Sequence, residues 1–276
     1  ELFVVAPATA DSLARLALGL AGDALGTTAL AVRCPTVLAP AMEPRMWDHP
    51  ATRDHVATLQ ARGAVVVGPV EGRMASGERG VGRMVEPDVL VEHLAAAIGR
   101  DGPLAGRHVV VSAGPTREET GPVRFLSNGS TGRMGYAIAR RARDLGAHVT
   151  LISGPVALPP PAALTFVSVE SAEAMCAAVL DVAPTADAIV MTAAVADYKP
   201  VRYSAEKVKK QPGDLVLTLD RTPDVLLALD AALAGAARRP VRVGFAAETS
   251  DLVGHARDKL VRKHLDLIVA NQVPAS

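Results

Sequence analysis

The sequence predicts an α/β protein with two domains, each a mostly parallel β-sheet flanked by helices. Short runs of Val, Ile and Leu alternate with longer helical patterns along the whole chain, as in repeated β-α-β units. Hydrophobic residues make up 49% of the chain but aromatic residues only 3%, so the interior must be built from Val and Ile in strands and Ala and Leu in helices. Residues 100–106 combine charge, Gly and Pro, which predicts a linker between a domain at 1–99 and another at 107–276.

The first domain alternates strand-like runs with helical patterns. The apolar run LFVV follows directly after Glu1, so we expect the chain to be a piece of a longer one with further elements upstream. The predicted strands are 2–5, 36–39 and 64–67, and the predicted helices begin near Ser12 and cover 52–61 and 87–98.

The second domain restarts the same alternation. The predicted strands are 108–111, 148–153, 166–169, 188–192, 215–219, 242–245 and 267–270, and the predicted helices are 136–145, 171–182, a helix from Thr222 and 251–264. The Pro-rich segment 155–163 is expected to be an extended loop. In open parallel sheets of this kind, ligands bind beyond the carboxyl ends of the strands.

The charge balance and the cysteines exclude several function classes. Lys plus Arg and Asp plus Glu number 29 each, so no overall field favours nucleic acid or an anionic membrane as a partner. No stretch approaches the length of apolar sequence that spans a bilayer. Cys34 and Cys176 lie outside any C-x-x-C pattern, which argues against a disulfide framework or a zinc site and favours a reducing, cytoplasmic location.

Residues 112–135, between a predicted strand and a predicted helix, are rich in glycine and hydroxyl side chains. Gly114, Ser130, Thr131 and Gly132 form a candidate loop for phosphate or substrate, because glycine admits close backbone approach and a helix start presents unpaired N–H groups. Arg124 can hold a phosphate or carboxylate, and the amide of Asn128 can donate to an oxyanion. The segment fits neither a Walker loop nor G-x-G-x-x-G, and the alternative is an ordinary structural loop.

Other strand ends of the second domain carry polar or basic residues. Asp197 could bind a base amino group or a metal, or could simply cap a turn. The run EKVKK at 206–210 is either a solvated charge cluster or, through Lys207, a group that offsets phosphate charge. Lys259 and Lys263 are spaced i and i+4 and therefore share one helix face.

The segments AGPTRE, PVRFLSN and STGRMG resemble the signature of phosphopantothenate-cysteine ligases, the second half of bifunctional coenzyme A biosynthesis proteins. The resemblance implies two Rossmann-like or flavodoxin-like domains and the CTP- and Mg²⁺-dependent joining of 4′-phosphopantothenate to L-cysteine through an acyl-cytidylate. It implies catalytic roles for Asn128, Arg124 and Lys207 and makes Asp197 a candidate Mg²⁺ ligand. The nucleotide-binding residues that it implies are Met191, Thr192, Ala193, Asp197, Lys207, Pro223, Asp224, Val225, Leu226, Phe245, Lys259 and Lys263.

Three segments of the first domain, APATADS at 6–12, PAMEPRMW at 40–47 and GRMASGERGVGRM at 72–84, resemble FMN-dependent phosphopantothenoylcysteine decarboxylases. The matching site residues are Ala8, Thr9, Asp11, Met42, Glu43 and Ser76. Three of them depart from the pattern: Asp11 stands for an asparagine, which relatives of the bifunctional type tolerate, Glu43 stands for another asparagine, and Ser76 stands for a reducing cysteine. The carboxylate of Glu43 would repel a substrate carboxylate unless it were protonated, and serine cannot replace a redox thiol. The sequence therefore supports the ligase reaction better than it supports decarboxylation.

The same resemblance implies a homo-oligomer, with trimers through the flavin half and dimers through the ligase half. It also implies a further segment after ANQV at 270–273, so the chain is expected to be clipped at that end too. The alternative function is a non-catalytic flavin-fold assembly or regulatory subunit, to which Glu43 and Ser76 point. A nicotinamide dehydrogenase is a third option that lacks the required glycine spacing.

Overall fold

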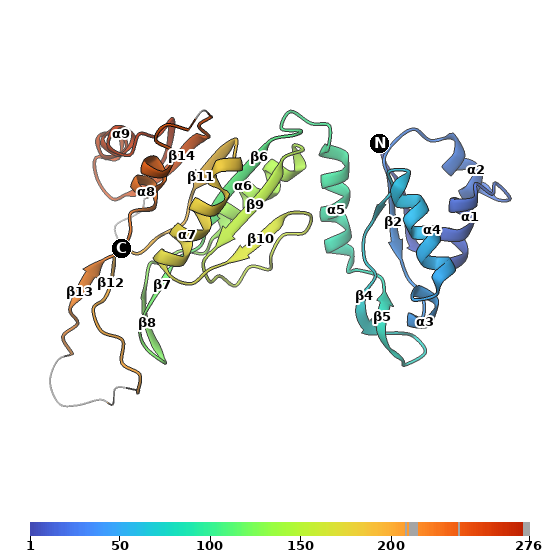
Figure 1. Ribbon diagram of the computed structural model, residues 1–276, viewed down its shortest axis with the longest axis horizontal. Helices are drawn as coiled ribbons and strands as arrows, with labels where there is room; N and C mark the ends of the chain where they lie inside the picture. Colours follow the sequence, from blue (N-terminus) through green and yellow to red (C-terminus); the bar gives the residue numbers. More distant parts are fainter. Residues whose placement is uncertain (208, 210–214, 237, 273–276) are drawn as a thin grey trace. The chain divides into compact units, whose positions relative to one another are not determined.

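The computed structural model of the chain divides into two compact units, Glu1–Gly102 and Pro103–Ser276. It describes residues 1–207, 209, 215–236 and 238–272. Each unit has its own parallel sheet, its own helices and its own buried apolar clusters (Figure 1). The predicted α/β fold class is therefore confirmed.

The first unit is a sheet of three parallel strands in the order β1-β2-β3 with helices on both faces. Leu38 packs with residues of α1 and α4 on one face, whereas its neighbour Val37 packs with residues of α5 on the other, because successive strand side chains point to opposite faces. The elements are β1 (Phe3–Ala8), α1 (Ala10–Leu18), α2 (Ala24–Ala31), β2 (Thr36–Pro40), α3 (Pro44–Trp47), α4 (Pro50–Ala61), β3 (Val65–Val66), β4 (Val70–Arg73), β5 (Arg79–Arg83) and α5 (Pro87–Gly99).

The second unit is built on six parallel strands in the order β10-β9-β6-β11-β14-β15. The chain winds from β6 outward to β10, returns to β11 beside β6, and winds outward again to β15. The sheet therefore has a topological switch point between β6 and β11, where ligand crevices form in doubly wound sheets. The strands of this sheet are β6 (His108–Ala113), β9 (His148–Ser153), β10 (Thr165–Ser168), β11 (Ala188–Met191), β14 (Val241–Glu248) and β15 (Leu267–Gln272).

Helices cover both faces of this sheet (Figure 1). On β6, Val110 belongs to the apolar cluster formed with α7 and α8, whereas Val109 and Val111 belong to the cluster formed with α6. Burial on both faces explains why the strand is an uninterrupted apolar run. The helices are α6 (Arg133–Asp144), α7 (Ala172–Val182), the short 3₁₀ helix η1 (Ala183–Thr185), α8 (Val225–Ala232) and α9 (Leu252–Arg262).

Two antiparallel pairs of the second unit differ from the sequence prediction. The glycine-rich segment 112–135 is not one loop, because β7 (Arg117–Gly121) and β8 (Arg124–Ser127) form a hairpin inside it. The strand predicted at 215–219 is wrong: only Leu219 belongs to a strand, β13 (Leu219–Arg221), which pairs with β12 (Tyr198–Pro200) outside the main sheet. Leu215 and Val216 are 65% and 85% exposed, so this apolar run is not part of the core.

The start of one helix differs from the prediction. Helix α8 starts at Val225 with Asp224 as its N-cap, rather than at Thr222, whose hydroxyl instead donates to the carbonyl of Ala196 at 2.5 Å. Cys34 and Cys176 are free thiols. Within the described ranges, no helix combines the length and apolarity that a bilayer span requires.

Candidate functional site

A pocket of about 710 Å³ lies at the carboxyl ends of β11 and β14 in the second unit. Its walls come from the loop after β11, the start of α8 and the last turns of α9. Parallel strands end at the same sheet edge, which is why segments far apart in the sequence meet here. Ten of the residues singled out from the sequence line it: Met191, Ala193, Asp197, Pro223, Asp224, Val225, Leu226, Phe245, Lys259 and Lys263.

Thr192, a further nucleotide-site candidate at the end of β11, does not line the pocket. Its hydroxyl donates to the carbonyl of Ser112 at 2.6 Å, and the Ser112 hydroxyl accepts from the N–H of Ala193 at 3.2 Å. A Cβ on Gly135 would lie 2.5 Å from Thr192 Oγ1, so only glycine lets α6 approach these strand ends. Thr192 therefore joins β6, β11 and α6 instead of lining the pocket.

Asn128 holds the pocket wall that follows β11. Its Nδ2 atom donates to the carbonyls of Val195 at 3.0 Å and Ala194 at 3.3 Å. The loop after β6 supports the same wall, because the Gly114 carbonyl accepts from the Ala194 N–H at 2.9 Å and the Thr116 hydroxyl accepts from the Ala196 N–H at 2.9 Å. Asn128 thus sits at the junction of the glycine-rich segment and the pocket.

Two lysines from one face of α9 reach the pocket. Lys259 Nζ donates to the carbonyl of Phe245 at 2.7 Å, and burial lowers the pKa of Lys259 below its ordinary value. Lys263 Nζ forms an ion pair with Asp224, whose other carboxylate oxygen accepts from the N–H of Leu227 at 3.2 Å. Burial raises the pKa of Asp224, but the bonds from Lys263 and from backbone N–H groups outweigh burial and leave the pKa below its usual value.

Several pocket residues were not found by sequence reasoning. Tyr198, Arg221, Glu248 and Arg262 also line the pocket. Glu248 ends β14, and its Oε2 lies 3.1 Å from Nδ1 of His255 on the first turn of α9. The available signal was the place of Glu248 in the segment GFAAET at 244–249, which follows a predicted strand and from which Phe245 alone was named as a nucleotide-binding residue.

Three groups of predicted residues do not line the pocket in the described structure. Arg124 is an exposed residue of β8, and Lys207 is exposed in the segment after β12. Lys210 of the lysine run lies outside the described residues. Gly132 is the N-cap of α6, with Ser130 accepting from its N–H at 3.4 Å, and Thr131 is exposed.

Packing accounts for two of the glycines in the predicted phosphate loop. Gly114 and Gly132 both have φ of 72°, which favours glycine. A Cβ on Gly114 would lie 2.9 Å from the carbonyl oxygen of Gly154, and one on Gly132 would lie 2.8 Å from Val156 Cγ1. No side chain caps α6, so its first N–H groups stay available to an anion.

The structure offers little protein ligation for a metal ion. No group of three or more His, Cys, Asp or Glu side chains in the described ranges could hold one. Asp197 is exposed on the pocket wall. Mg²⁺ is commonly held by one or two carboxylates together with substrate phosphates, so Asp197 fits this ion only as a partial ligand shared with a nucleotide.

The first unit brings its own candidate residues to one edge of its sheet. The N–H of Ala41, after β2, donates to the carbonyl of Ala8 at 3.0 Å, and the N–H of Met42 donates to Gly82 on β5 at 3.0 Å. Ser76, between β4 and β5, donates from Oγ to Glu43 Oε2 at 3.0 Å. Glu43 and Ser76, both of which depart from the decarboxylase pattern, are therefore direct partners.

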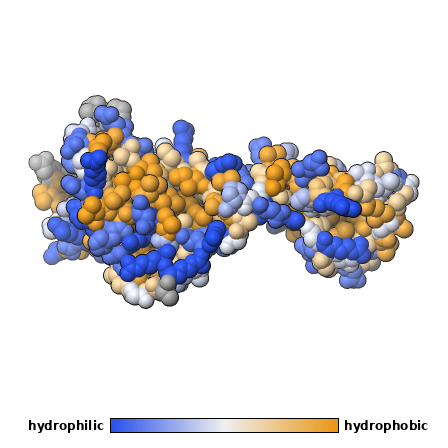
Figure 2. Space-filling model, turned by 90° about the horizontal axis from the view of Figure 1, so that it is seen from above, coloured by the Kyte–Doolittle hydropathy of each residue, from blue (hydrophilic) through white to orange (hydrophobic). Residues whose placement is uncertain are grey.

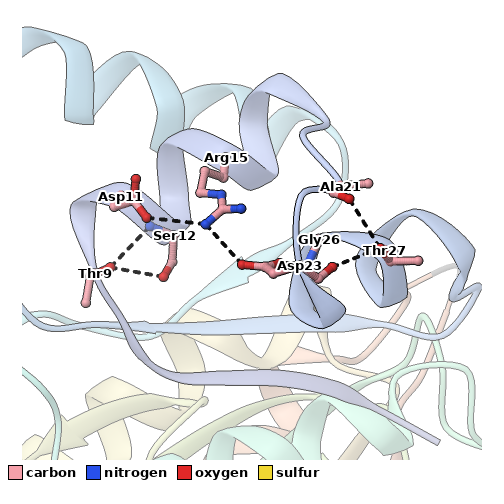
Figure 3. A network of polar contacts seen from close by, with 8 residues as sticks. All are labelled: Thr9, Asp11, Ser12, Arg15, Ala21, Asp23, Gly26 and Thr27. Atoms are coloured by element: carbon pink, nitrogen blue, oxygen red, sulfur yellow. Dashed lines mark hydrogen bonds and ion pairs between the residues drawn. The ribbon is translucent and has the colours of Figure 1, made fainter.

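Thr9 and Asp11 have local structural contacts in this unit. The Thr9 side chain caps α1 by accepting from the N–H of Ser12 at 3.1 Å. Figure 3 shows Arg15 of α1 between two carboxylates, 3.9 Å from Asp11 and 3.0 Å from Asp23. The Asp11 side chain remains 78% exposed, so the weak contact leaves it accessible.

Comparison with known proteins agrees with this two-unit organisation. Residues 104–276 match the family model of the DNA/pantothenate metabolism flavoprotein C-terminal domain, and residues 1–99 match the Flavoprotein model. A Bacillus subtilis (strain 168) protein named coenzyme A biosynthesis bifunctional protein CoaBC is 47% identical over 281 residues, covering 100% of this chain and 68% of that protein. The chain belongs to the CoaBC family.

A second CoaBC relative and a crystal structure of one CoaBC domain are also similar to the chain. The CoaBC protein of Mycobacterium tuberculosis (strain H37Rv) is 48% identical over 285 residues, which cover 99% of this chain and 68% of that protein. The crystal structure of the C-terminal domain of a CoaBC protein has 43% identity and a TM-score of 0.52, covering 60% of this chain and 77% of that one. The family assignment places the chain among enzymes of coenzyme A biosynthesis.

A more distant structure supports the fold alone. The DNA/pantothenate metabolism flavoprotein from Streptococcus pneumoniae is 24% identical, with a TM-score of 0.53 over 60% of this chain and 82% of that one. Within the CoaBC family, the pocket of the second unit falls in the C-terminal domain, and the Glu43–Ser76 contact falls in the Flavoprotein domain.

Proposed function

We propose that the second unit joins 4′-phosphopantothenate to L-cysteine at the expense of CTP. The observation that carries the proposal is the pocket at the carboxyl ends of β11 and β14, which Lys259 and Lys263 line together with Phe245 and Leu226. Phe245 and Leu226 offer surface for a nucleobase, while Lys259 and Lys263 offer positive charge for phosphates. Membership in the CoaBC family supports this assignment.

The reaction proceeds in two displacements. The carboxylate of 4′-phosphopantothenate attacks the α-phosphorus of CTP, and the bond to pyrophosphate breaks. The amine of cysteine then attacks the acyl carbon of the acyl-cytidylate, CMP leaves, and the nitrogen loses a proton to solvent. The lysines offset phosphate charge by their position, without covalent catalysis by the protein, and Asp197 would help to hold Mg²⁺, which would supply further positive charge for the phosphates.

The proposed site residues outside the pocket lining are assigned to binding of 4′-phosphopantothenate and to the second displacement. Asn128, which lies beside the pocket wall, stabilises the acyl-cytidylate and its tetrahedral successor, and this requires an N–H of its amide to turn from the carbonyls of Ala194 and Val195 to the substrate. The start of α6, with Gly132 at its N-cap, receives an anionic group of phosphopantothenate. Arg124 holds substrate and Lys207 offsets phosphate charge, which requires the exposed segments that carry them to close over bound nucleotide.

The decisive test is pyrophosphate release from CTP and Mg²⁺ with 4′-phosphopantothenate, measured with and without cysteine. Release that depends on 4′-phosphopantothenate, followed by amide formation when cysteine is added, is the expected result. The matched control replaces CTP by cytidine diphosphate, which has no pyrophosphate to release from its α-phosphorus. Failure of the wild-type chain to bind CTP would overturn the proposal.

For the first unit we infer an FMN-binding domain that does not complete decarboxylation by itself. The loops after β1 and β2 meet at one sheet edge, which fits a flavin site, and the Flavoprotein model supports it. When bound, FMN supplies the oxidation that decarboxylation of a cysteine group needs. The Ser76–Glu43 contact favours a non-catalytic assembly role, because it places a carboxylate and a hydroxyl where the decarboxylase pattern has an amide and a thiol.

Two measurements separate these possibilities for the first unit. FMN binding is followed by quenching of flavin fluorescence, and CO₂ release is followed with 4′-phosphopantothenoylcysteine. We expect flavin binding without CO₂ release from the wild-type chain. CO₂ release at an ordinary enzymatic rate would contradict the assembly role and assign the unit to catalysis.

We also propose that the second unit pairs with another copy of the chain. Apolar residues reach the surface of this unit (Figure 2). Val123 and Phe125 of the β7–β8 hairpin and Leu215 and Val216 before β13 are exposed. Exposed apolar clusters on small domains commonly mark protein contacts. Sedimentation velocity should show a dimer or a larger even assembly, and a monomer at micromolar concentration would contradict the proposal.

A further inference from the structure

Lys263 forms an ion pair with a carboxylate of its own chain. Its side chain is 11% exposed, and its Nζ forms an ion pair with Asp224 inside the pocket. The other lysine of the same helix face, Lys259, is bonded to an uncharged partner, the carbonyl of Phe245. Lys263 therefore has a carboxylate at ion-pair distance, whereas the bonded partner of Lys259 is a carbonyl and the charge of Glu248 acts on Lys259 without an ion pair.

Two contacts fix the carboxylate of Asp224 in the pocket wall. One oxygen accepts from the N–H of Leu227 and caps α8, and the other faces Lys263. The cap keeps the carboxylate in the pocket wall after the lysine turns away. A phosphate that approaches Lys263 must take over a cation that Asp224 holds, and it then remains next to a fixed negative charge.

We propose that Asp224 weakens nucleotide binding by acting as a built-in counter-ion of Lys263, which the phosphates must displace. The inference rests on the nucleotide site proposed above and concerns its affinity. A carboxylate in this position speeds release of the anionic products, pyrophosphate and CMP, as well as limiting the affinity for CTP. It also keeps Lys263 extended toward the pocket before nucleotide arrives.

The test is the dissociation constant for CTP with Mg²⁺ measured by calorimetry on Asp224→Asn. Asparagine keeps a cap acceptor but removes the charge, so we expect binding about fivefold to tenfold tighter than in the wild type, from one charge contact at a partly exposed site. The matched control is Asp230→Asn. Asp230 lies on the same helix and bonds to Arg242 and His264 away from the pocket, so this variant should bind CTP like the wild type.

Two further binding measurements test whether the pairing of Asp224 with Lys263 causes the change in affinity. The gain of Asp224→Asn should become smaller in a Lys263→Met background, because the counter-ion then has no Lys263 to occupy and only its direct repulsion of the phosphates and its interaction with Lys259 remain. Binding of cytidine, which has no phosphates, should be the same in Asp224→Asn and the wild type. Asp224→Ser, which also keeps a cap acceptor, serves as the second uncharged variant if the asparagine variant does not fold.

The outcomes separate this inference from the proposed function. Unchanged or weaker CTP binding by a folded Asp224→Asn chain would overturn the counter-ion role while leaving the nucleotide site intact. A gain that is undiminished without Lys263 would also overturn it. A wild-type chain that does not bind CTP would overturn the proposed function itself.

Discussion

The side-chain amide of Asn128 donates to the backbone carbonyl of Val195 across 3.0 Å. This bond joins the end of the β7–β8 hairpin to a loop that lines the nucleotide pocket, although the two residues are 67 positions apart in the sequence. The contact links the position of a proposed catalytic residue to the shape of the pocket. It also sets the first of the expected outcomes.

Asn128→Asp should separate the two displacements of the proposed reaction. A carboxylate cannot donate to the Val195 carbonyl or to an oxyanion, so amide formation should fall by about a hundredfold or more, which is the loss typical for one oxyanion donor. Pyrophosphate release without cysteine should persist. Rapid-quench measurement of both products checks this, and wild-type amide formation by the variant would remove Asn128 from the mechanism.

Lys259→Met should lower nucleotide affinity and raise stability. Burial lowers the pKa of Lys259, which means that the folded state holds this charge at a cost that an apolar side chain of similar length does not have. We expect the dissociation constant for CTP to rise more than tenfold while Tm rises by about 1–3 °C. Arg257→Met on the exposed side of α9 is the matched control, and it should change the CTP constant less than twofold.

Gly135→Ala should destabilise the second unit. The added Cβ would lie 2.5 Å from Thr192 Oγ1 and 2.6 Å from Ala113 Cβ, so α6 must move away from the sheet. Overpacking of this kind costs about 1–3 kcal/mol in the free energy of unfolding. Gly129→Ala, where nothing lies within 4 Å of the added atom, should be close to neutral in the same urea titration followed by circular dichroism. Equal stability of the two variants would contradict the close approach of α6.

The protein should lose stability as pH falls below the ordinary pKa of histidine. Burial and the neighbouring ring of His148, with ring centroids 4.8 Å apart, lower the pKa of His108, while a bond with Thr185 raises it less. Protons then bind the unfolded chain more readily, so stability is full above about pH 6.5 and declines below it. His108→Gln should show a smaller difference in unfolding free energy between pH 7.5 and 5.5, and an undiminished difference would exclude His108 as the cause.

The elements with strong patterns could be predicted from the sequence. The buried runs at 108–111 and 148–153 and the helix at 171–182 recur in β6, β9 and α7, because a strand buried on both faces must be apolar throughout. The apolar run at 215–219 looked the same but is exposed, because hydrophobicity alone does not decide which runs find a place in the sheet. The hairpins β4–β5 and β7–β8 were missed, since glycine-rich sequence gives no period-2 signal.

The sequence by itself determined the α/β class and the residue types at the strand ends, because these depend on local periodicity and on turn chemistry. Only the tertiary structure decided which of those residues meet. It placed Asp224, Phe245, Lys259 and Lys263 in one pocket and left Arg124 and Lys207 on exposed segments. It also paired Ser76 with Glu43 and Lys263 with Asp224. Such contacts join residues through the winding order of the sheet and the packing of side chains, and neither is written in the spacing of residues along the chain.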